Sequence, residues 1–189
     1  ISTSLQIPIE KLIEKDKLDV TDEAQVKEKI EKIKPDILIN TSAYHVVPMC
    51  ENNPELAMAI NFKAVWNLAK ICKENNIIFV TYSTDYVFDG KKGMPYQENY
   101  APNPLQIYGI SKLAGEYAAL NSYPKGVFVI RTCGLYGGKT GSPEKGGNFV
   151  LNILKQANSK KNIQVSSEQI ISPTYAGDLS KATLKLLNS

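Results

Sequence analysis

Short runs of apolar and β-branched residues alternate with longer helical patterns along this chain, and that alternation limits its possible folds more than any other feature. The runs cover residues 36–41, 77–82 and 127–132. Each is short enough for a strand that is buried on both faces. Alternating strands and helices imply right-handed crossovers, so we expect an α/β fold with a doubly wound, Rossmann-like parallel sheet and helices on both faces.

Capping residues and apolar spacing predict where the helices lie. Thr21 or Asp22 can cap a helix that carries Val26, Ile30 and Ile33, because all three apolar residues fall on one helical face. Further helices are expected from Pro54 onward, from about 104 to 121 and near 148–158, the last after a Gly-rich loop at 134–147.

Size and composition favour one soluble globular domain over residues 1–189. Hydrophobic residues make up 43% and charged residues 22% of the chain. No run approaches the roughly 18 apolar residues of a membrane span, so we expect no membrane partner. The formal net charge is only +3, with lysines and glutamates interleaved, so we expect no nucleic-acid partner.

Cysteine and histidine content argues against disulfides and metal catalysis. The three cysteines, Cys50, Cys72 and Cys133, are widely spaced and without a CxxC pair. This favours free thiols in a reducing cytoplasm. His45 is the only histidine, so no zinc site is expected.

Polar segments follow each expected strand directly. They are Thr41-Ser42-Ala43, Ser83-Thr84-Asp85 and Thr132-Cys133-Gly134. Ligands of such sheets bind beyond the carboxyl ends of the strands, so we expect all three segments to face one crevice.

Tyr108 and Lys112 are four residues apart in a helical pattern, which places both on one helical face. The spacing alone says little, because the chain has 10 tyrosines and about one residue in nine is lysine. A surface contact between the two side chains is the simple alternative.

Three ordered motifs give the pair more weight. They are YSTDYVFDG at 82–90, NPLQIYGISKLAGE at 103–116 and RTCGLYG at 131–137. Together they resemble the extended class of short-chain dehydrogenases, and within it the dTDP-4-dehydrorhamnose reductase family. The likeness runs from about residue 36 to residue 178.

The resemblance implies reduction of a nucleotide-sugar 4-ketone by NADPH or NADH, with dTDP-4-dehydro-L-rhamnose as the expected substrate and dTDP-L-rhamnose as the product. Such a reduction needs an acid beside the carbonyl oxygen. The resemblance implies that Tyr108 is that acid, that Thr84 orients the carbonyl, and that Lys112 anchors the ribose. A nearby ammonium is also expected to lower the pKa of the tyrosine from its usual value of about 10.

Other contacts follow from the resemblance by position. The cofactor is expected to meet, besides Tyr108 and Lys112, the residues Asp19, Val20, Thr41, Ser42, Ala43 and Thr132. The substrate is expected to meet, besides Thr84, the residues His45, Asp85, Tyr86, Asn148 and Phe149. The hydroxyl side chains at residues 2–4 slightly favour NADPH over NADH as the cofactor. Asp19 could equally be a helix-capping turn residue, and His45 a hydrogen-bonded structural residue.

The sequence departs from the family pattern at several points. Its first glycine is Gly90, so the Gly-rich turn that approaches a pyrophosphate is missing. We expect a Rossmann-like domain without its first βα unit and its C-terminal end, with substrate-binding elements within about 134–175. Pro48 and Gly134 stand where relatives commonly carry Asp and Trp, which leaves another nucleotide sugar open.

Two alternatives remain on the same fold. One is a non-catalytic, cofactor-binding regulatory subunit, and the other is a nucleotide-sugar epimerase or dehydratase. Dehydratases usually carry an Asp-Glu pair after the threonine, where this chain has Asp85-Tyr86, so simple reduction is favoured. A homodimer is also left open.

Overall fold

The computed structural model describes residues 18–137, 148–159, 162–165 and 170–189. The chain forms two compact units, Ile1–Arg131 and Thr132–Ser189, and each is described by itself. The hydroxyls at 2–4 and most of the expected Gly-rich loop lie outside the described residues.

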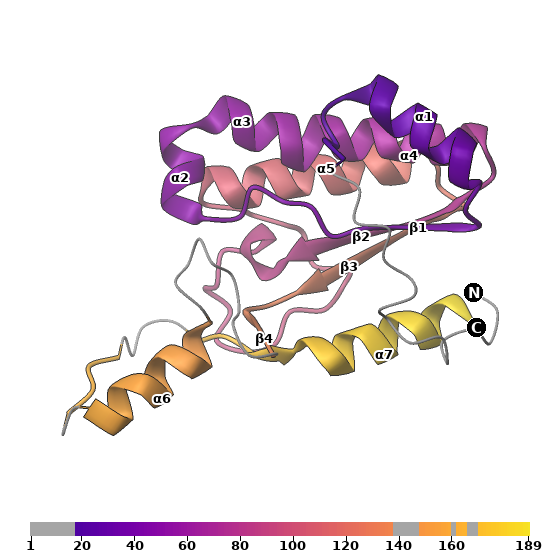
Figure 1. The fold of residues 1–189 in the computed structure, drawn as a ribbon. Helices are drawn as coiled ribbons and strands as arrows, with labels where there is room; N and C mark the ends of the chain where they lie inside the picture. Colours follow the sequence, from indigo (N-terminus) through magenta and orange to yellow (C-terminus); the bar gives the residue numbers. More distant parts are fainter. Residues whose placement is uncertain (1–17, 138–147, 160–161, 166–169) are drawn as a thin grey trace. The chain divides into compact units, whose positions relative to one another are not determined.

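The three expected strands form one sheet with the order β1-β2-β3 (Figure 1). They are β1 (Ile37–Asn40), β2 (Ile78–Thr84) and β3 (Val127–Thr132). β1 and β2 are parallel, with Ile37 opposite Ile78 and Asn40 opposite Thr81. The predicted α/β class with a parallel, Rossmann-like sheet is therefore confirmed.

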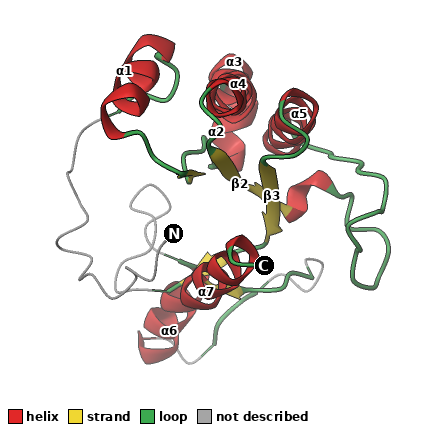
Figure 2. Ribbon diagram, turned by 90° about the vertical axis from the view of Figure 1, so that its right-hand side faces the viewer, coloured by secondary structure: helices red, strands yellow, loops and turns green. Residues whose placement is uncertain are grey.

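Helices α1 (Glu23–Ile33), α4 (Val65–Glu74) and α5 (Ile107–Ser122) lie in a row over one face of this sheet (Figure 2). Asp22 caps α1, since its side chain accepts hydrogen bonds from the backbone N–H groups of Ala24 and Gln25. The expected apolar face is buried except at Ile33, which is 62% exposed because the helix ends there.

The helix that opens at Pro54 is continuous but not uniform. It consists of α3 (Pro54–Met58), a π-helical segment (Ala59–Ala64) and α4. A π-helical segment is rare and costs stability, and such segments are frequent at functional sites. The short α2 (Val47–Asn52) precedes it and was not predicted.

α5 begins at Ile107, three residues later than expected from the sequence. The residue before it, Gln106, is extended, with φ −125° and ψ 158°. The two prolines at 102 and 104 lie in the non-helical segment that leads into the helix.

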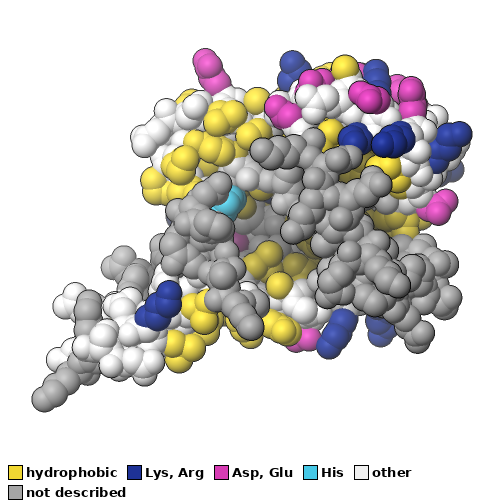
Figure 3. Space-filling model, viewed as in Figure 1, with side chains coloured by type: hydrophobic (Ala, Val, Ile, Leu, Met, Phe, Trp, Pro, Cys, Tyr) yellow, Lys and Arg dark blue, Asp and Glu magenta, His cyan; other side chains and the backbone are white. Residues whose placement is uncertain are grey.

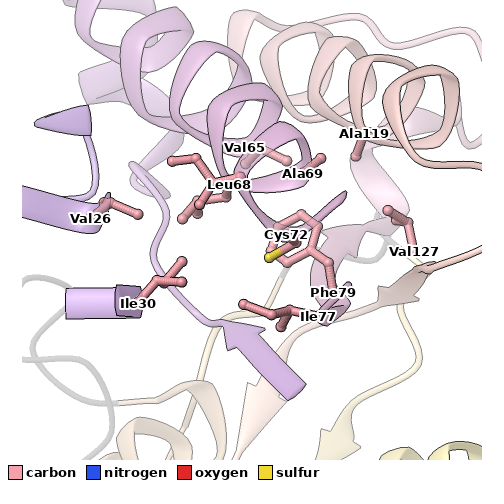
Figure 4. Packing of buried hydrophobic residues seen from close by; sticks show 11 residues of the cluster. Val26, Ile30, Val65, Leu68, Ala69, Cys72, Ile77, Phe79, Ala119 and Val127 are labelled. Carbon is pink, nitrogen blue, oxygen red and sulfur yellow. The ribbon is translucent and has the colours of Figure 1, made fainter. Parts of the chain in front are cut away.

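The core lies between the helical layer and the sheet (Figure 4). It is formed by Val26, Ile30, Val65, Leu68, Ala69, Ile71, Cys72, Ile77, Phe79, Ala119 and Val127. Phe79 of β2 is fully buried, and such a side chain contributes about 1.5–3 kcal/mol to folding. Burial also raises the pKa of the Cys72 thiol to about 12, which keeps it neutral. This packing holds β2 in place, and β2 carries Thr84 at its carboxyl end.

The second unit contains two short parallel strands and two helices. The strands are β4 (Leu135–Tyr136) and β5 (Thr174–Tyr175), and the helices are α6 (Phe149–Ser159) and α7 (Ala176–Leu187). α6 was predicted within one residue at each end, whereas α7 and the two strands were not predicted.

Side chains of both charge signs are intermixed over α1 and α4 on the face seen in Figure 3. Within the described parts of the chain, the helices are all too short or too polar to cross a membrane.

Candidate active site

Thr84 ends β2 and begins the single 3₁₀ turn Asp85–Val87. Its hydroxyl accepts a hydrogen bond from Tyr86 N at 3.2 Å and donates one to Asp85 Oδ1 at 3.1 Å. The side chain is only 5% exposed. Thr84 is thus held in one position at the carboxyl end of the sheet, where such folds bind ligands.

Tyr108 lies in the first turn of α5, beside this threonine. The Thr84 hydroxyl lies close enough to the Tyr108 phenol to affect its pKa, and the Tyr108 ring meets the Tyr86 ring edge to face, with centroids 5.5 Å apart and planes at 73°. Gly109 makes the close approach possible, because a Cβ there would meet the Tyr86 carbonyl oxygen at 2.2 Å. The structure therefore brings Thr84, Tyr86 and Tyr108 together.

Burial raises the pKa of Tyr108 to about 12, and the Asp85 carboxylate acts in the same direction. The Thr84 hydroxyl opposes the rise but does not cancel it. This differs from the expected lowering by Lys112, because loss of solvent around the phenol outweighs the other effects. Tyr108 consequently keeps its proton through the neutral pH range and can act as an acid there.

Lys112 follows one helical turn after Tyr108 and is only 5% exposed. Its Nζ donates a hydrogen bond to the Tyr82 carbonyl oxygen at 2.6 Å. Burial lowers the pKa of Lys112 to about 8, although the Glu116 carboxylate favours the charged form. An ammonium can donate three hydrogen bonds, and the Tyr82 carbonyl accepts one of them.

Ser83 lies next to that carbonyl, and its Oγ is the one buried side-chain N or O atom without a hydrogen-bond partner in the described part of the chain. An unsatisfied buried hydroxyl costs stability, and in a folded protein it can indicate a ligand site. Ser83 and Lys112 line the same small pocket. The space between these side chains does not admit even a water molecule, so a ribose does not fit there in this structure.

Asn61, in the π-helical segment, connects the loop after β1 to α5. Its Oδ1 accepts from Tyr44 N at 2.9 Å, and its Nδ2 donates to Tyr44 O at 2.8 Å and to Ser111 Oγ at 3.0 Å. A Cβ on Gly115 would meet the Asn61 carbonyl oxygen at 2.2 Å, so this approach needs glycine. Asn61 was not among the site residues inferred from the sequence, although its position is one of those that carry the family resemblance.

α5 receives a cap from α2. Glu51 Oε1 accepts a hydrogen bond from Ile107 N at 2.7 Å, while Gln106 makes no side-chain cap. A carboxylate at a helix N-terminus is favourable both as an acceptor and for the helix dipole. This contact fixes the first turn of α5, which carries Tyr108.

The turn after β1 is held by Asn40. Asn40 Oδ1 accepts hydrogen bonds from Ser42 N at 3.0 Å and Ser42 Oγ at 2.6 Å, and its Nδ2 donates to Thr81 Oγ1 at 3.3 Å. Thr41 is exposed, and His45 Nδ1 lies 3.4 Å from Ala43 O. The contact with Ala43 O agrees with a structural role for His45. A contact between His45 and a substrate stays a prediction.

Asp19 and Val20 lie before α1. The Asp19 carboxylate accepts from Thr21 N at 2.9 Å and Thr21 Oγ1 at 2.7 Å, and these bonds lower its pKa. Asp19 is thus a turn residue, but it does not cap the helix as one of the two readings expected, because Asp22 provides the cap. Val20 lines a largely apolar groove between α1 and β1. A cofactor contact at Asp19 or Val20 stays a prediction.

Three further residues of the inferred site belong to the second unit. Thr132 is the last residue of β3, Asn148 Oδ1 caps α6 by accepting from Leu151 N at 2.9 Å, and Phe149 is 59% exposed. Their expected roles remain predictions. In the described segments of both units, no group of three or more His, Cys, Asp or Glu side chains could hold a metal ion.

Comparison with known proteins finds one matching family and several similar proteins. Residues 7–189 match the profile of the family described as the RmlD substrate binding domain. The dTDP-4-dehydrorhamnose reductase of Salmonella typhimurium is 37% identical over 165 residues, which cover 87% of this chain and 53% of that protein. The probable low-salt glycan biosynthesis reductase Agl14 of Haloferax volcanii is 36% identical over 172 residues, covering 91% and 57%.

A solved structure agrees with these sequence matches. The crystal structure of dTDP-4-dehydrorhamnose reductase from Bacillus anthracis in complex with NADP superposes with a TM-score of 0.84 at 36% identity. The match covers 91% of this chain and 59% of that protein. The chain thus spans little more than half the length of these relatives.

Proposed function

The chain belongs to the RmlD substrate binding domain family, and from that membership we propose that it acts in an NAD(P)H-dependent reductase of nucleotide-sugar ketones. The proposed reaction converts dTDP-4-dehydro-L-rhamnose to dTDP-L-rhamnose. The name of the Salmonella relative supports this substrate, whereas the name of Agl14 refers to a low-salt glycan and specifies no sugar. The identity of the sugar is therefore the finer part of the proposal.

The observation that carries the proposal is the proximity of the Tyr108 phenol to the Thr84 hydroxyl at the carboxyl end of β2. A ketone oxygen that enters this site would accept the phenol proton while hydride is added to its carbon. The raised pKa of Tyr108 keeps that proton available at neutral pH, as a general acid requires. Thr84 would orient the same oxygen through its hydroxyl.

The cofactor supplies the hydride when it is bound. Lys112 Nζ is the group that we expect to hold its ribose hydroxyls, because an ammonium can donate two hydrogen bonds beyond the one that the Tyr82 carbonyl accepts. A buried ammonium with a pKa of about 8 also favours phenolate once Tyr108 has given up its proton. NADP in the Bacillus anthracis relative supports NADPH, and NADH is to be tested beside it.

The remaining contacts are proposed from position. The proposed cofactor contacts are Asp19, Val20, Thr41, Ser42, Ala43 and Thr132. The proposed substrate contacts are His45, Asp85, Tyr86, Asn148 and Phe149, and we place further substrate-binding elements within about 134–175.

Oxidation of NADPH in the presence of a panel of dTDP-4-keto sugars tests the proposal, with the protein expressed from its whole reading frame. We expect Tyr108→Phe to lower kcat by about 100- to 10,000-fold, because the acid is lost, and to leave cofactor affinity nearly unchanged. Tyr100→Phe is a matched control, since Tyr100 contacts Lys92 away from Thr84. Equal rates for wild type and Tyr108→Phe would refute the assignment, as would cofactor binding without turnover of any sugar in the panel.

A further inference from the structure

Arg131, on β3, is the only arginine in a sequence with 21 lysines. Its side chain extends to α5, where two of its nitrogens donate hydrogen bonds to the Glu116 carboxylate. Its Nε lies 3.0 and 3.1 Å from the two carboxylate oxygens, and its Nη2 lies 2.6 Å from Glu116 Oε2. Where lysine is used so heavily, a lone arginine marks a position that needs what lysine lacks, namely a planar fork and a permanent charge.

The ion pair is mostly buried. The Glu116 side chain is 3% exposed and that of Arg131 is 24% exposed, with the Phe88 ring 5.1 Å from the guanidinium carbon. A buried ion pair is a weak source of stability, because removing two charges from water costs about as much as their attraction returns. The placement of this pair therefore has to be explained by its surroundings.

Lys112 is the neighbour that matters. It lies one helical turn before Glu116 on α5, which brings side chains to the same face, and both line the pocket that contains Ser83. The Glu116 carboxylate thus lies between a lysine of its own helix and an arginine of β3. Other groups also face these charges, since the Tyr82 carbonyl from β2 accepts from Lys112, while Tyr117 and Glu98 act on Arg131.

We propose that Glu116 and Arg131 are positioning residues that together set the charge of Lys112. Glu116 stabilises the buried ammonium, and Arg131 limits that stabilisation because it orients the carboxylate and offsets its charge. Without Glu116 the buried ammonium would lose the carboxylate that stabilises it and would lose its proton more easily. Without Arg131 the free carboxylate would hold the lysine in its charged form.

The balance has a catalytic consequence that rests on the proposed reductase function. A lysine that is cationic near neutral pH but can release a proton is suited both to hold a ribose and to return a proton towards Tyr108. The opposing influences on its pKa, burial that lowers it and Glu116 that raises it, agree with such a balance.

Carbon-13 NMR titration of protein labelled at lysine Cε tests the proposal, with the Lys112 signal assigned by its loss in Lys112→Met. Relative to wild type, we expect the midpoint to fall by about one pH unit in Glu116→Gln and to rise by about one pH unit in Arg131→Gln. The double variant should fall between the two single variants. Shifts of both single variants in the same direction, or no shift beyond that of the control, would overturn the proposal.

Two further variants sharpen the result. Glu23→Gln is the control, because Glu23 forms an exposed ion pair one helical turn from Lys27, at 2.7 Å, and should leave the Lys112 midpoint unchanged. Arg131→Lys keeps the positive charge, so its midpoint should lie closer to wild type than that of Arg131→Gln. If Glu116→Gln does not fold, the two substitutions of Arg131 still decide the outcome, and equal midpoints for them would refute a role for its charge.

The titration requires no turnover, so it separates this proposal from the reductase function. Midpoints that move in opposite directions in a protein that reduces no sugar ketone would support the charge balance and refute the reductase. If the protein is active, the pH profile of kcat/KM should move in the same direction as the Lys112 midpoint in each variant.

Discussion

Replacing Lys112 with methionine should stabilise the protein relative to wild type, and this stabilisation should be larger at pH 7 than at high pH. The reason is the cost of burying an ammonium. Lys112 is 5% exposed, and its pKa of about 8 in the folded protein is well below the usual 10.5. Each pKa unit corresponds to about 1.4 kcal/mol, so the charged form costs the folded state about 3 kcal/mol.

The sign follows from proton binding. Between pH 8 and 10.5 the unfolded chain keeps the Lys112 proton while the folded chain has lost it, so the free energy of unfolding of wild type rises with pH. Methionine has no such dependence. The stability difference between Lys112→Met and wild type should therefore shrink by about 3 kcal/mol from pH 7 to above pH 10.5. Lys112→Met also loses the hydrogen bond to the Tyr82 carbonyl. This loss is nearly the same at both pH values, because a neutral amine in wild type also donates.

Urea unfolding at pH 7 and pH 10, followed by the fluorescence of Trp66, measures this difference. Trp66 is the only tryptophan and is 40% exposed in the folded protein. Lys27→Met is the control, since the exposed ion pair with Glu23 raises the pKa of Lys27 and should give a pH trend of opposite sign. A stability difference for Lys112→Met that is the same at both pH values would refute the reasoning.

Three substitutions test the packing around the site. Gly115→Ala should cost roughly 1–3 kcal/mol in urea unfolding, because its Cβ would collide with the Asn61 carbonyl; in Gly134→Ala the new Cβ comes no closer than 3.8 Å to a neighbour, so an equal loss there would contradict this. Asn61→Ala should lower stability by about 3 kcal/mol, since three buried hydrogen bonds are lost, and a loss no larger than that of Asn75→Ala would argue against the connecting role. Asp22→Ala should cost about 1 kcal/mol and reduce the helical circular dichroism signal, and unchanged values would exclude a cap.

Local patterns predicted the regular parts of the fold well. The three strands, the Asp22 cap and the helix from Pro54 follow from apolar spacing and capping chemistry, which act between residues close in sequence. α2 has six residues with a proline near its start, and β4 and β5 have two residues each. Elements so short are stabilised by contacts with other segments, and no local pattern indicates them.

The candidate site divides in the same way. The sequence placed Thr84 at a strand end and Tyr108 on a helix through local patterns, but it paired them only through the family resemblance. It did not indicate the connection through Asn61, whose partners lie 17 and 50 residues away. The direction of the Tyr108 pKa was predicted wrongly, since burial dominates it and burial is a property of the folded chain.

The π-helical segment Ala59–Ala64 has a consequence for changes in chain length. A π-helical turn contains about one residue more than an α-helical turn, so deleting one residue there would give a regular α-helix. It would also change the direction in which the Asn61 side chain projects relative to α4. Tyr44 would then lose its tether to α5, although no side chain of the apolar core had been replaced. This stretch should therefore tolerate substitution better than the loss of a single codon.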